Sequence, residues 1–270
     1  MGFVIIYADQ GVDGLALRHT VKSLQRELDL SKHPIRRMDA KQILQDSWQE
    51  DAALLVVPGG RDIFYHEALK KRGTEKIRDF VLAGGGYLGI CAGGYFGASA
   101  IEFEKGHRLE VCAKRDLGFF PGLAIGPAYG LGKYSYENTT GAEAAQISWR
   151  GDGMRVYYNG GCYFQGADLY PQIEILSRYM DLPNTPASII RQNIGKGSAI
   201  LSGVHFEYSP SLRFSADAYL EKIFSLLTPF ELQRRQLLRD VLSSFFLALQ
   251  GLPEKKVMTK QKEFFKMQIE

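Results

Sequence analysis

Strand-like apolar runs alternate with helical patterns through the first hundred residues. Residues 3–7 combine β-branched and aromatic side chains, and residues 52–57 form a continuous apolar run. Between them lie a helical pattern at residues 15–28, a short strand pattern at residues 35–38 and a second helical pattern at residues 40–45. Because continuous apolar strands are typical of parallel sheets covered on both faces, we predict an α/β domain with a doubly wound, mostly parallel sheet.

The pattern changes over residues 118–166, where glycines, tyrosines and short alternating runs predominate. The runs at residues 145–149 and 155–158 indicate antiparallel hairpins, so we expect an insertion or an extended edge of the sheet here. Three further strand patterns follow, at residues 173–179, 187–192 and 197–202.

Beyond Pro229 the chain carries an apolar stripe at helical spacing. Its members are Leu232, Leu237, Leu238, Val241, Leu242, Phe245 and Phe246. Such a stripe far more often packs against the parent domain or a second subunit than binds a ligand. From residue 253 the chain is rich in lysine and weakly patterned, which indicates a solvated tail. We therefore predict a domain over residues 1–228 and a helical C-terminal extension over residues 229–270, which is a candidate contact for a homo-oligomer.

Composition excludes several classes of function. The 33 basic and 30 acidic residues are too balanced for a nucleic-acid or anionic-membrane footprint, so small or neutral partners fit better. Three cysteines without CxxC spacing indicate neither a disulfide framework nor a zinc site, and a reducing, cytoplasmic compartment is expected. No apolar run reaches the length of a membrane span, and the first residues do not read as a signal peptide. Neither a metal nor a cofactor is predicted.

Cys91 lies between glycines directly after an apolar run. Gly89-Ile90-Cys91-Ala92-Gly93-Gly94 predicts a strand, a sharp turn and a helix, with the thiol at the apex of the turn. There the thiol faces the positive end of the helix, which favours the nucleophilic thiolate. These six residues alone fit a buried structural cysteine equally well.

Two other segments supply groups that a cysteine nucleophile needs. Pro58-Gly59-Gly60 also follows a buried strand, so the N–H groups of Gly59 and Gly60, with that of Ala92, are candidates for an oxyanion hole. His205 and Glu207 are two apart on an extended segment and point the same way, so the carboxylate can orient the imidazole toward Cys91. The plainer alternatives are a strand-ending turn and a histidine that caps a strand.

The order and spacing of these motifs resemble the class I glutamine amidotransferase-like superfamily. The segments are Val57-Pro58-Gly59-Gly60, Gly89-Ile90-Cys91-Ala92-Gly93 and Gly203-Val204-His205-Phe206-Glu207. Within the superfamily, the chain is most similar to the amino-terminal domain of fungal-type biotin–protein ligases and to stand-alone bacterial proteins. Phe119-Phe120-Pro121-Gly122 and Tyr158-Asn159-Gly160-Gly161 extend the resemblance, which covers roughly residues 3–228.

The resemblance implies a flavodoxin-like fold and a catalytic triad of Cys91 as nucleophile, His205 as general base and Glu207 as orienting acid. It departs from the family pattern at Phe206, where a proline is usual. No segment after residue 229 is long enough for a synthase module, and the loop that binds the adenylate in biotin ligases is absent. An acceptor protein or synthase would therefore be a separate chain.

Six further residues are candidates for substrate binding around Cys91. They are Arg61, Asp62, Tyr95, Arg115, Tyr129 and Asn159. Arginines can bind a substrate carboxylate and tyrosines can form an apolar wall, although surface arginines and packed tyrosines are common. Cys112 and Cys162 lie on no comparable turn and are expected to be inert.

Three functions remain open from the sequence. The first is a cysteine-dependent amidohydrolase or amidotransferase-like enzyme that acts on a small-molecule amide or acyl substrate. The second is a non-catalytic ligand-binding or regulatory module related to biotin–protein ligase. The third is a protease-like or glyoxalase-like relative whose acid follows the first strand; Asp9 is the candidate there, and the His205-x-Glu207 pair argues against it.

Overall fold

The computed structural model describes residues 2–212 and 217–251. Its main sheet contains eleven strands in the order β2-β1-β3-β4-β13-β12-β10-β7-β5-β6, with β11 paired to β12. These strands are β1 (Phe3–Tyr7), β2 (Ile35–Met38), β3 (Ala52–Val57), β4 (Gly86–Ile90), β5 (Ala98–Phe103), β6 (Val111–Lys114), β7 (Phe120–Gly126), β10 (Tyr163–Phe164), β11 (Ile173–Arg178), β12 (Ala187–Ile194) and β13 (Gly197–Ser202). The helices are α1 (Gly14–Glu27), α2 (Ala40–Gln45), α3 (Asp62–Leu69), α4 (Arg72–Ala83), α5 (Ala92–Gly97), α6 (Ala218–Leu227) and α7 (Glu231–Ser244), with short 3₁₀ turns at Ala167–Leu169 and Thr228–Phe230.

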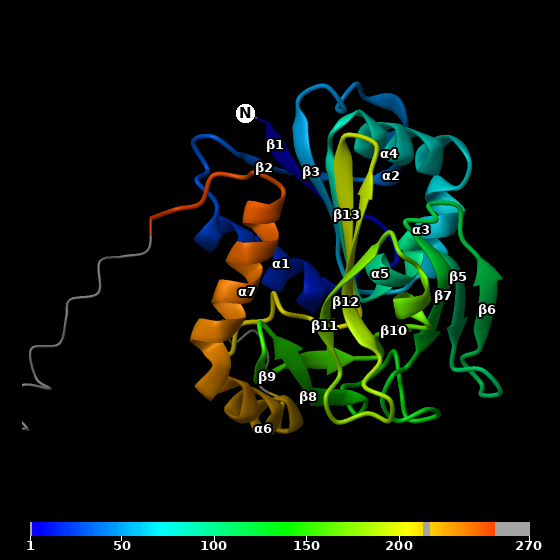
Figure 1. Ribbon diagram of the computed structural model, residues 1–270, viewed down its shortest axis with the longest axis vertical. Coiled ribbons are helices and arrows are strands. Elements are labelled where there is room, and N and C mark those ends of the chain that lie inside the picture. The colour runs from blue at the N-terminus through cyan, green and yellow to red at the C-terminus, as the bar shows by residue number, and fades with distance from the viewer. Residues whose placement is uncertain (1, 213–216, 252–270) are drawn as a thin grey trace, which may run out of the picture.

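The half of the sheet that carries the early strands is parallel. β2, β1, β3, β4 and β13 pair in parallel, whereas β12 and β10 run antiparallel to their neighbours. The α/β fold with a doubly wound sheet and a C-terminal helix is therefore as predicted. A separate antiparallel hairpin, β8 (Ala142–Trp149) and β9 (Asp152–Asn159), lies across the lower end of the molecule beside α6 (Figure 1).

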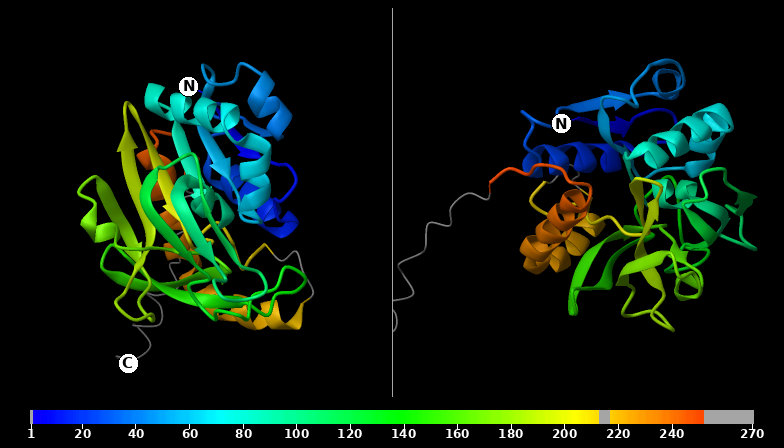
Figure 2. Two further views of the ribbon diagram at one scale, coloured as in Figure 1. Left: turned by 90° about the vertical axis from the view of Figure 1, so that its right-hand side faces the viewer. Right: turned by 45° about the horizontal axis from the view of Figure 1, so that its top comes forward.

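Both faces of the parallel half are covered. In β1, Ile5 and Tyr7 belong to an apolar cluster with residues of α2, α3 and α4, whereas Val4 and Ile6 belong to a cluster on the opposite face. The second cluster also contains residues of α1, α7 and the β8–β9 hairpin. Figure 2 shows α1 and α7 on one side of the sheet and α4 on the other. This alternation of buried side chains explains why the strands read as continuous apolar runs.

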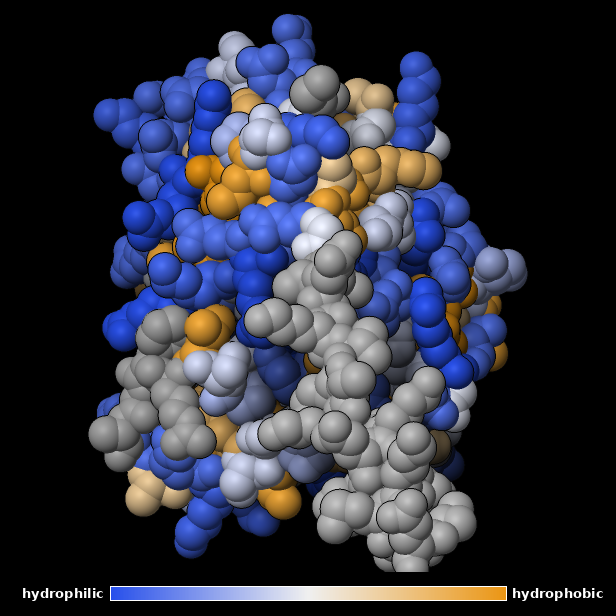
Figure 3. Space-filling model, turned by 90° about the vertical axis from the view of Figure 1, so that its left-hand side faces the viewer, coloured by the Kyte–Doolittle hydropathy of each residue, from blue (hydrophilic) through white to orange (hydrophobic). Residues whose placement is uncertain are grey.

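α7 packs against the rest of the chain. Leu237, Leu238 and Leu242 are almost completely buried in the same cluster as β1 and β3, whereas the predicted stripe residues Leu232 and Phe246 are exposed to solvent. The outer surface on this side of the molecule is mainly hydrophilic, with small apolar areas between charged ones (Figure 3). The lysine-rich tail predicted from residue 253 lies outside the described residues.

No helix in the described ranges is both long enough and apolar enough to span a bilayer.

Candidate active site

Three neighbouring parallel strands place the predicted motifs at one edge of the sheet. β4 lies between β3 and β13, and the pairs Val57–Gly89 and Ser202–Ile90 bring the carboxyl ends of all three strands into register. Pro58-Gly59-Gly60, Cys91 and the segment that leads to His205 follow these ends. Segments that are far apart in the sequence therefore meet at the position where α/β sheets usually carry their sites.

Cys91 occupies a strained turn between β4 and α5. Its φ of 52° and ψ of −104° lie in a backbone region that residues other than glycine rarely adopt. The turn depends on neighbouring glycines: a Cβ on Gly93 would lie 2.0 Å from the Val57 carbonyl oxygen, and one on Gly94 would lie 2.6 Å from that of Ser202. The Cys91 N–H donates to the Ser202 carbonyl at 2.7 Å, which ties the turn to β13.

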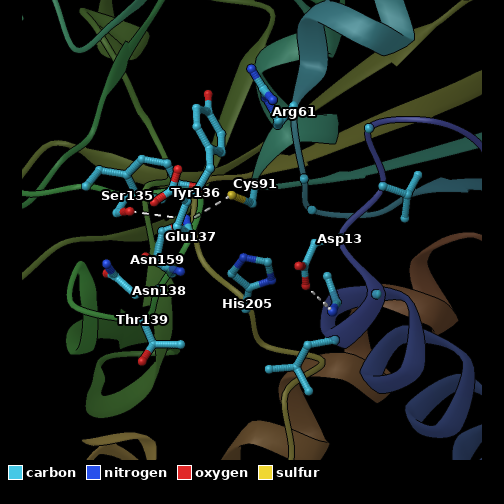
Figure 4. A pocket seen from close by; sticks show the side chains of 18 of the residues that line it. Asp13, Arg61, Cys91, Ser135, Tyr136, Glu137, Asn138, Thr139, Asn159 and His205 are labelled. Carbon is cyan, nitrogen blue, oxygen red and sulfur yellow. Dashed lines mark hydrogen bonds between the residues drawn. The ribbon is translucent and has the colours of Figure 1, made fainter. Parts of the chain in front are cut away.

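The Cys91 thiol lies in the wall of a cavity of about 540 Å³. Cys91 is 5% exposed, and its Sγ lies 3.6 Å from the main-chain oxygen of Asn159. His205 lines the same cavity and lies beside Cys91, with Asp13 on its other side (Figure 4). The structure thus brings the predicted nucleophile and base to one cavity.

Glu207 lies against the imidazole of His205. Nδ1 of His205 lies 2.7 Å from Oε1 of Glu207, and both side chains are almost completely buried. Burial favours the neutral imidazole, but the charges of Glu207 and Cys91 and their hydrogen bonds outweigh it and raise the pKa of His205 to about 10. The imidazole is therefore protonated at neutral pH and can supply a proton.

The three predicted oxyanion-hole donors lie beside this pair. Gly59 and Gly60 line the large cavity, and a Cβ on Gly59 would lie 2.5 Å from Cε1 of His205. Ala92 lines a small adjoining space of about 20 Å³ together with Cys91 and Gly60. Among the described residues, the N–H groups of Gly59, Gly60 and Ala92 donate to no main-chain or side-chain acceptor, so they are free to bind an oxygen of a ligand.

Two of the predicted substrate-binding residues line the large cavity. Arg61 lies at its rim, with its guanidinium 4.1 Å from the centre of the Tyr136 ring. Asn159 lines the cavity and has a buried side-chain oxygen without a donor in the described part of the chain.

Two others bind each other. Nε of Arg115 donates to Oδ2 of Asp62 at 2.7 Å, and the two side chains are 1% and 12% exposed. Burial raises the pKa of Asp62 by more than the charge of Arg115 lowers it. Both side chains are thus engaged in a buried pair. Asp62 also lines the small space beside Cys91, whereas Arg115 is absent from the lining of the two cavities that Cys91 lines.

The two predicted tyrosines are engaged within the fold. Tyr95 lines the small space beside Cys91 and donates to the Gly160 carbonyl at 3.1 Å. Tyr129 binds Asp181 through its hydroxyl, packs against Tyr158 and lies away from the three cavities.

The remaining cysteines and Asp9 lie elsewhere. Cys112 is exposed on β6, and Cys162 is buried within the main apolar cluster. Asp9 accepts hydrogen bonds from the N–H groups of Gln10 and Ala40. Another residue of the same loop, Asp13, lines the cavity and caps α1 by accepting from the Ala16 N–H at 2.8 Å.

Other cavity residues were not predicted from the sequence. The segment 134–139 forms one wall, and Tyr157 and Tyr208 stack at a centroid distance of 4.2 Å beneath His205. Tyr208 directly follows Glu207, so its position next to the predicted acid could have indicated that it lies at the site. The segment 134–139 carries no recognisable motif, because only the folded chain brings it to Cys91. In the described ranges, no group of three or more His, Cys, Asp or Glu side chains is arranged to bind a metal ion.

Comparisons with known proteins identify the family. Residues 3–268 match the family model described as biotin–protein ligase, N terminal. An uncharacterized protein of Chlamydia muridarum is 40% identical over 210 residues, which are 77% of this chain and 81% of that protein. A biotin–protein ligase of Schizosaccharomyces pombe is 36% identical over 215 residues, which are 76% of this chain but only 33% of the ligase.

Two solved structures share the fold. A glutamine amidotransferase, 19% identical, superimposes with a TM-score of 0.53 over 87% of this chain and 100% of that one. A glutamine amidotransferase from Thermotoga maritima, 14% identical, gives a TM-score of 0.54 over 90% of this chain and 97% of that one. The chain therefore belongs to the family of biotin–protein ligase amino-terminal domains and has a glutamine amidotransferase-like fold.

Proposed function

We propose that this protein is a cysteine-dependent amidohydrolase or amidotransferase-like enzyme with a Cys91–His205–Glu207 triad. The observation that carries the proposal is the single cavity in which Cys91, on a strained turn, lies beside an imidazole bound to a buried carboxylate at 2.7 Å. A structural cysteine needs neither the strain nor the polar partners. The triad assigns a role to each of these features.

The reaction starts from the ion pair in which His205 holds the proton of the Cys91 thiol. The thiolate attacks the carbonyl carbon of a carboxamide, a C–S bond forms, and the carbonyl electron pair moves onto oxygen. The N–H groups of Gly60 and Ala92 are the proposed donors to this oxyanion. When the electron pair returns, the C–N bond breaks, the leaving nitrogen takes the proton from His205, and a thioester remains.

Water or an acceptor amine resolves the thioester. Neutral His205 accepts a proton as the nucleophile attacks, the C–S bond breaks, and the Cys91 thiolate and the protonated imidazole are restored. Hydrolysis gives a carboxylic acid, and aminolysis gives a new amide. An acceptor amine from a separate protein would enter at this step.

The cavity favours a substrate with an extended acyl part. Its volume of about 540 Å³ is far larger than one carboxamide group requires, and Tyr134, Tyr136 and Phe64 contribute aromatic surface to its walls. Arg61 at the rim can pair with a carboxylate of such a substrate. The proposed substrate class is therefore an amide whose acyl body packs on aromatic side chains.

Intact-mass detection of an acyl adduct tests the proposal. The protein is incubated with glutamine, other primary amides and biotin-related amides, and hydrolysis is followed by ammonia release. We expect a covalent adduct on Cys91 with at least one amide, and Cys91→Ala should abolish both adduct and turnover while thermal stability stays nearly unchanged. Cys112→Ser, at an exposed thiol on β6, is the matched control and should retain activity.

A different outcome would favour the ligand-binding alternative. Turnover that persists in Cys91→Ala contradicts the triad. Thermal stabilisation by one of these amides that is equal in wild type and Cys91→Ala, with no adduct in either, supports a binding or regulatory module instead.

A further inference from the structure

The His205–Glu207 segment depends on the rest of the molecule for its shape. It follows β13 and has no strand partner beyond one bridge, in which the His205 N–H donates to the Tyr157 carbonyl at 2.8 Å. Oε1 of Glu207 binds His205, whereas its buried Oε2 has no donor among the described residues. The carboxylate is thus held by its main chain and by the imidazole it orients.

Arg234 of α7 holds the main chain between His205 and Glu207. It is 2% exposed, and its Nη1 donates to the Phe206 carbonyl at 2.7 Å. Its Nε and Nη2 bind both oxygens of Glu231, at 2.9 and 3.1 Å. The Ser209 hydroxyl donates to the same carboxylate at 2.8 Å. The guanidinium therefore clamps one side of the segment directly and the other through Glu231.

The Phe206 carbonyl belongs to the peptide group that joins Phe206 to Glu207. When that plane is fixed, only rotation about the N–Cα bond of Glu207 can still change the direction in which its side chain leaves the backbone. The next peptide is held as well, because the Ser23 hydroxyl of α1 donates to the Glu207 carbonyl at 2.5 Å. That second peptide is also held by the Tyr208 N–H, which donates to the His205 carbonyl at 3.4 Å, whereas among the described residues Arg234 is the donor to the Phe206 carbonyl.

We infer that Arg234 is a positioning residue that holds Glu207 against His205 and so keeps the Cys91–His205 pair ready for reaction. The inference rests on the proposed function, because it assigns to α7 a part in the same triad. It makes the C-terminal helix part of the active-site structure, although Arg234 itself lines none of the cavities around Cys91.

The test compares Arg234→Met and Arg234→Lys with wild type by two measurements that need no substrate. The first is the titration of His205, followed by NMR of ¹³C-labelled histidine. The second is the rate of Cys91 alkylation by iodoacetamide between pH 5 and pH 10, followed by peptide mass spectrometry. In Arg234→Met we expect the pKa of His205 to move toward neutral pH by about one unit or more. The alkylation rate of Cys91 at pH 7 should fall by about tenfold. Arg234→Lys should lie between the two.

Arg235→Met is the matched control. Arg235 is the next residue of α7 and binds Glu27 at 2.6 Å, and in the described part of the chain it has no hydrogen bond or ion pair with the segment 205–209. Its loss should lower thermal stability but leave the His205 titration and the alkylation profile unchanged. This separates positioning of the triad from general weakening of α7.

Either of two results overturns the inference. One is a folded Arg234→Met with wild-type titration and alkylation profiles; the other is a matching shift in Arg235→Met. If Arg234→Met does not fold, Arg234→Lys decides, and wild-type profiles in that variant contradict the inference. Failure of the proposed function is distinguishable, since it would appear as turnover in Cys91→Ala whatever the Arg234 variants do.

Discussion

At the scale of single residues, the turn at Cys91 depends on glycines that admit no side chain. Gly93 lies so close to the carbonyl oxygen of Val57, on the neighbouring strand, that a Cβ atom on it would clash with that oxygen. Backbone cannot move away as a flexible side chain can, so the cost of a larger residue falls on the packing of β3 against the turn.

We predict that Gly93→Ala destabilises the protein strongly. The new Cβ would lie 2.0 Å from the Val57 oxygen, and relief requires a backbone shift that costs about 3 kcal/mol or more. Gly14→Ala is the control: it has no atom within 4 Å of the added Cβ and lies at the start of α1, so the change should be within about 1 kcal/mol. Urea unfolding measures both, and equal stabilities would contradict the prediction.

The His205–Glu207 pair predicts a specific dependence of stability on pH. The pKa of His205 is raised in the folded protein from its ordinary 6.5 to about 10. The stabilisation of the protonated imidazole is therefore fully present below about pH 6.5 and is lost as the pH rises through about 10. Glu207→Gln removes the carboxylate that raises this pKa.

We expect the free energy of unfolding of Glu207→Gln to fall below that of wild type most strongly near pH 6, with a gap that narrows toward pH 10. Urea denaturation at several pH values measures it. The exposed Glu50, changed to Gln, should show no comparable dependence. A gap that widens with rising pH would show that another group dominates.

At the scale of elements, α7 is joined to α1 by a buried ion cluster. Glu27 is 1% exposed, and its oxygens accept from Nε of Arg235 at 2.6 Å and Nη1 of Arg239 at 2.9 Å. Burial alone would raise the pKa of Glu27, but the hydrogen bonds and charges of the two arginines together lower it. Its contribution to stability is therefore present above about pH 4.5 and is lost as the pH falls below that value.

Glu27→Gln should cost about 3 kcal/mol at pH 7, because it leaves two partly buried arginines without their counter-charge. The deficit relative to wild type should shrink at acidic pH, where Glu27 becomes protonated. Glu67, whose pair with Lys70 is largely exposed, provides the comparison, and Glu67→Gln should change stability by less than about 1 kcal/mol. Equal effects of the two substitutions would argue against the buried cluster.

At the scale of the whole molecule, the two apolar clusters share the strands of one sheet. α7 belongs to one of them, and α2 to α5 belong to the other. Adjacent residues of β1 and β3 contribute to opposite clusters. Loss of either helical layer would therefore expose apolar side chains of the strands that also form the core of the other cluster. The predicted division at residue 229 therefore separates segments of the sequence that pack together.

The protein should accordingly unfold in one cooperative transition. Its two tryptophans report on opposite layers, since Trp48 lies in the cluster with α2 and Trp149 packs against the cluster with α7. We expect the urea midpoint of Trp149 fluorescence in Trp48→Phe to coincide with the circular-dichroism midpoint of that variant, and likewise for Trp48 in Trp149→Phe. Separate midpoints would indicate two independently folding parts.

The sequence by itself determined the parallel sheet, the glycine-bound Cys91 turn and the grouping of Cys91 with His205 and Glu207. These follow from local chemistry, because buried strands require apolar runs, a strained turn requires glycines, and parallel strands bring their carboxyl ends to one edge. Only the tertiary structure decided which polar side chains remain available around them. Asp62 pairs with Arg115 and Tyr129 turns away, since side-chain partners depend on contacts between distant segments. For the same reason, the sequence could not indicate that Arg234, in the predicted C-terminal extension, donates a hydrogen bond to the peptide group that precedes Glu207.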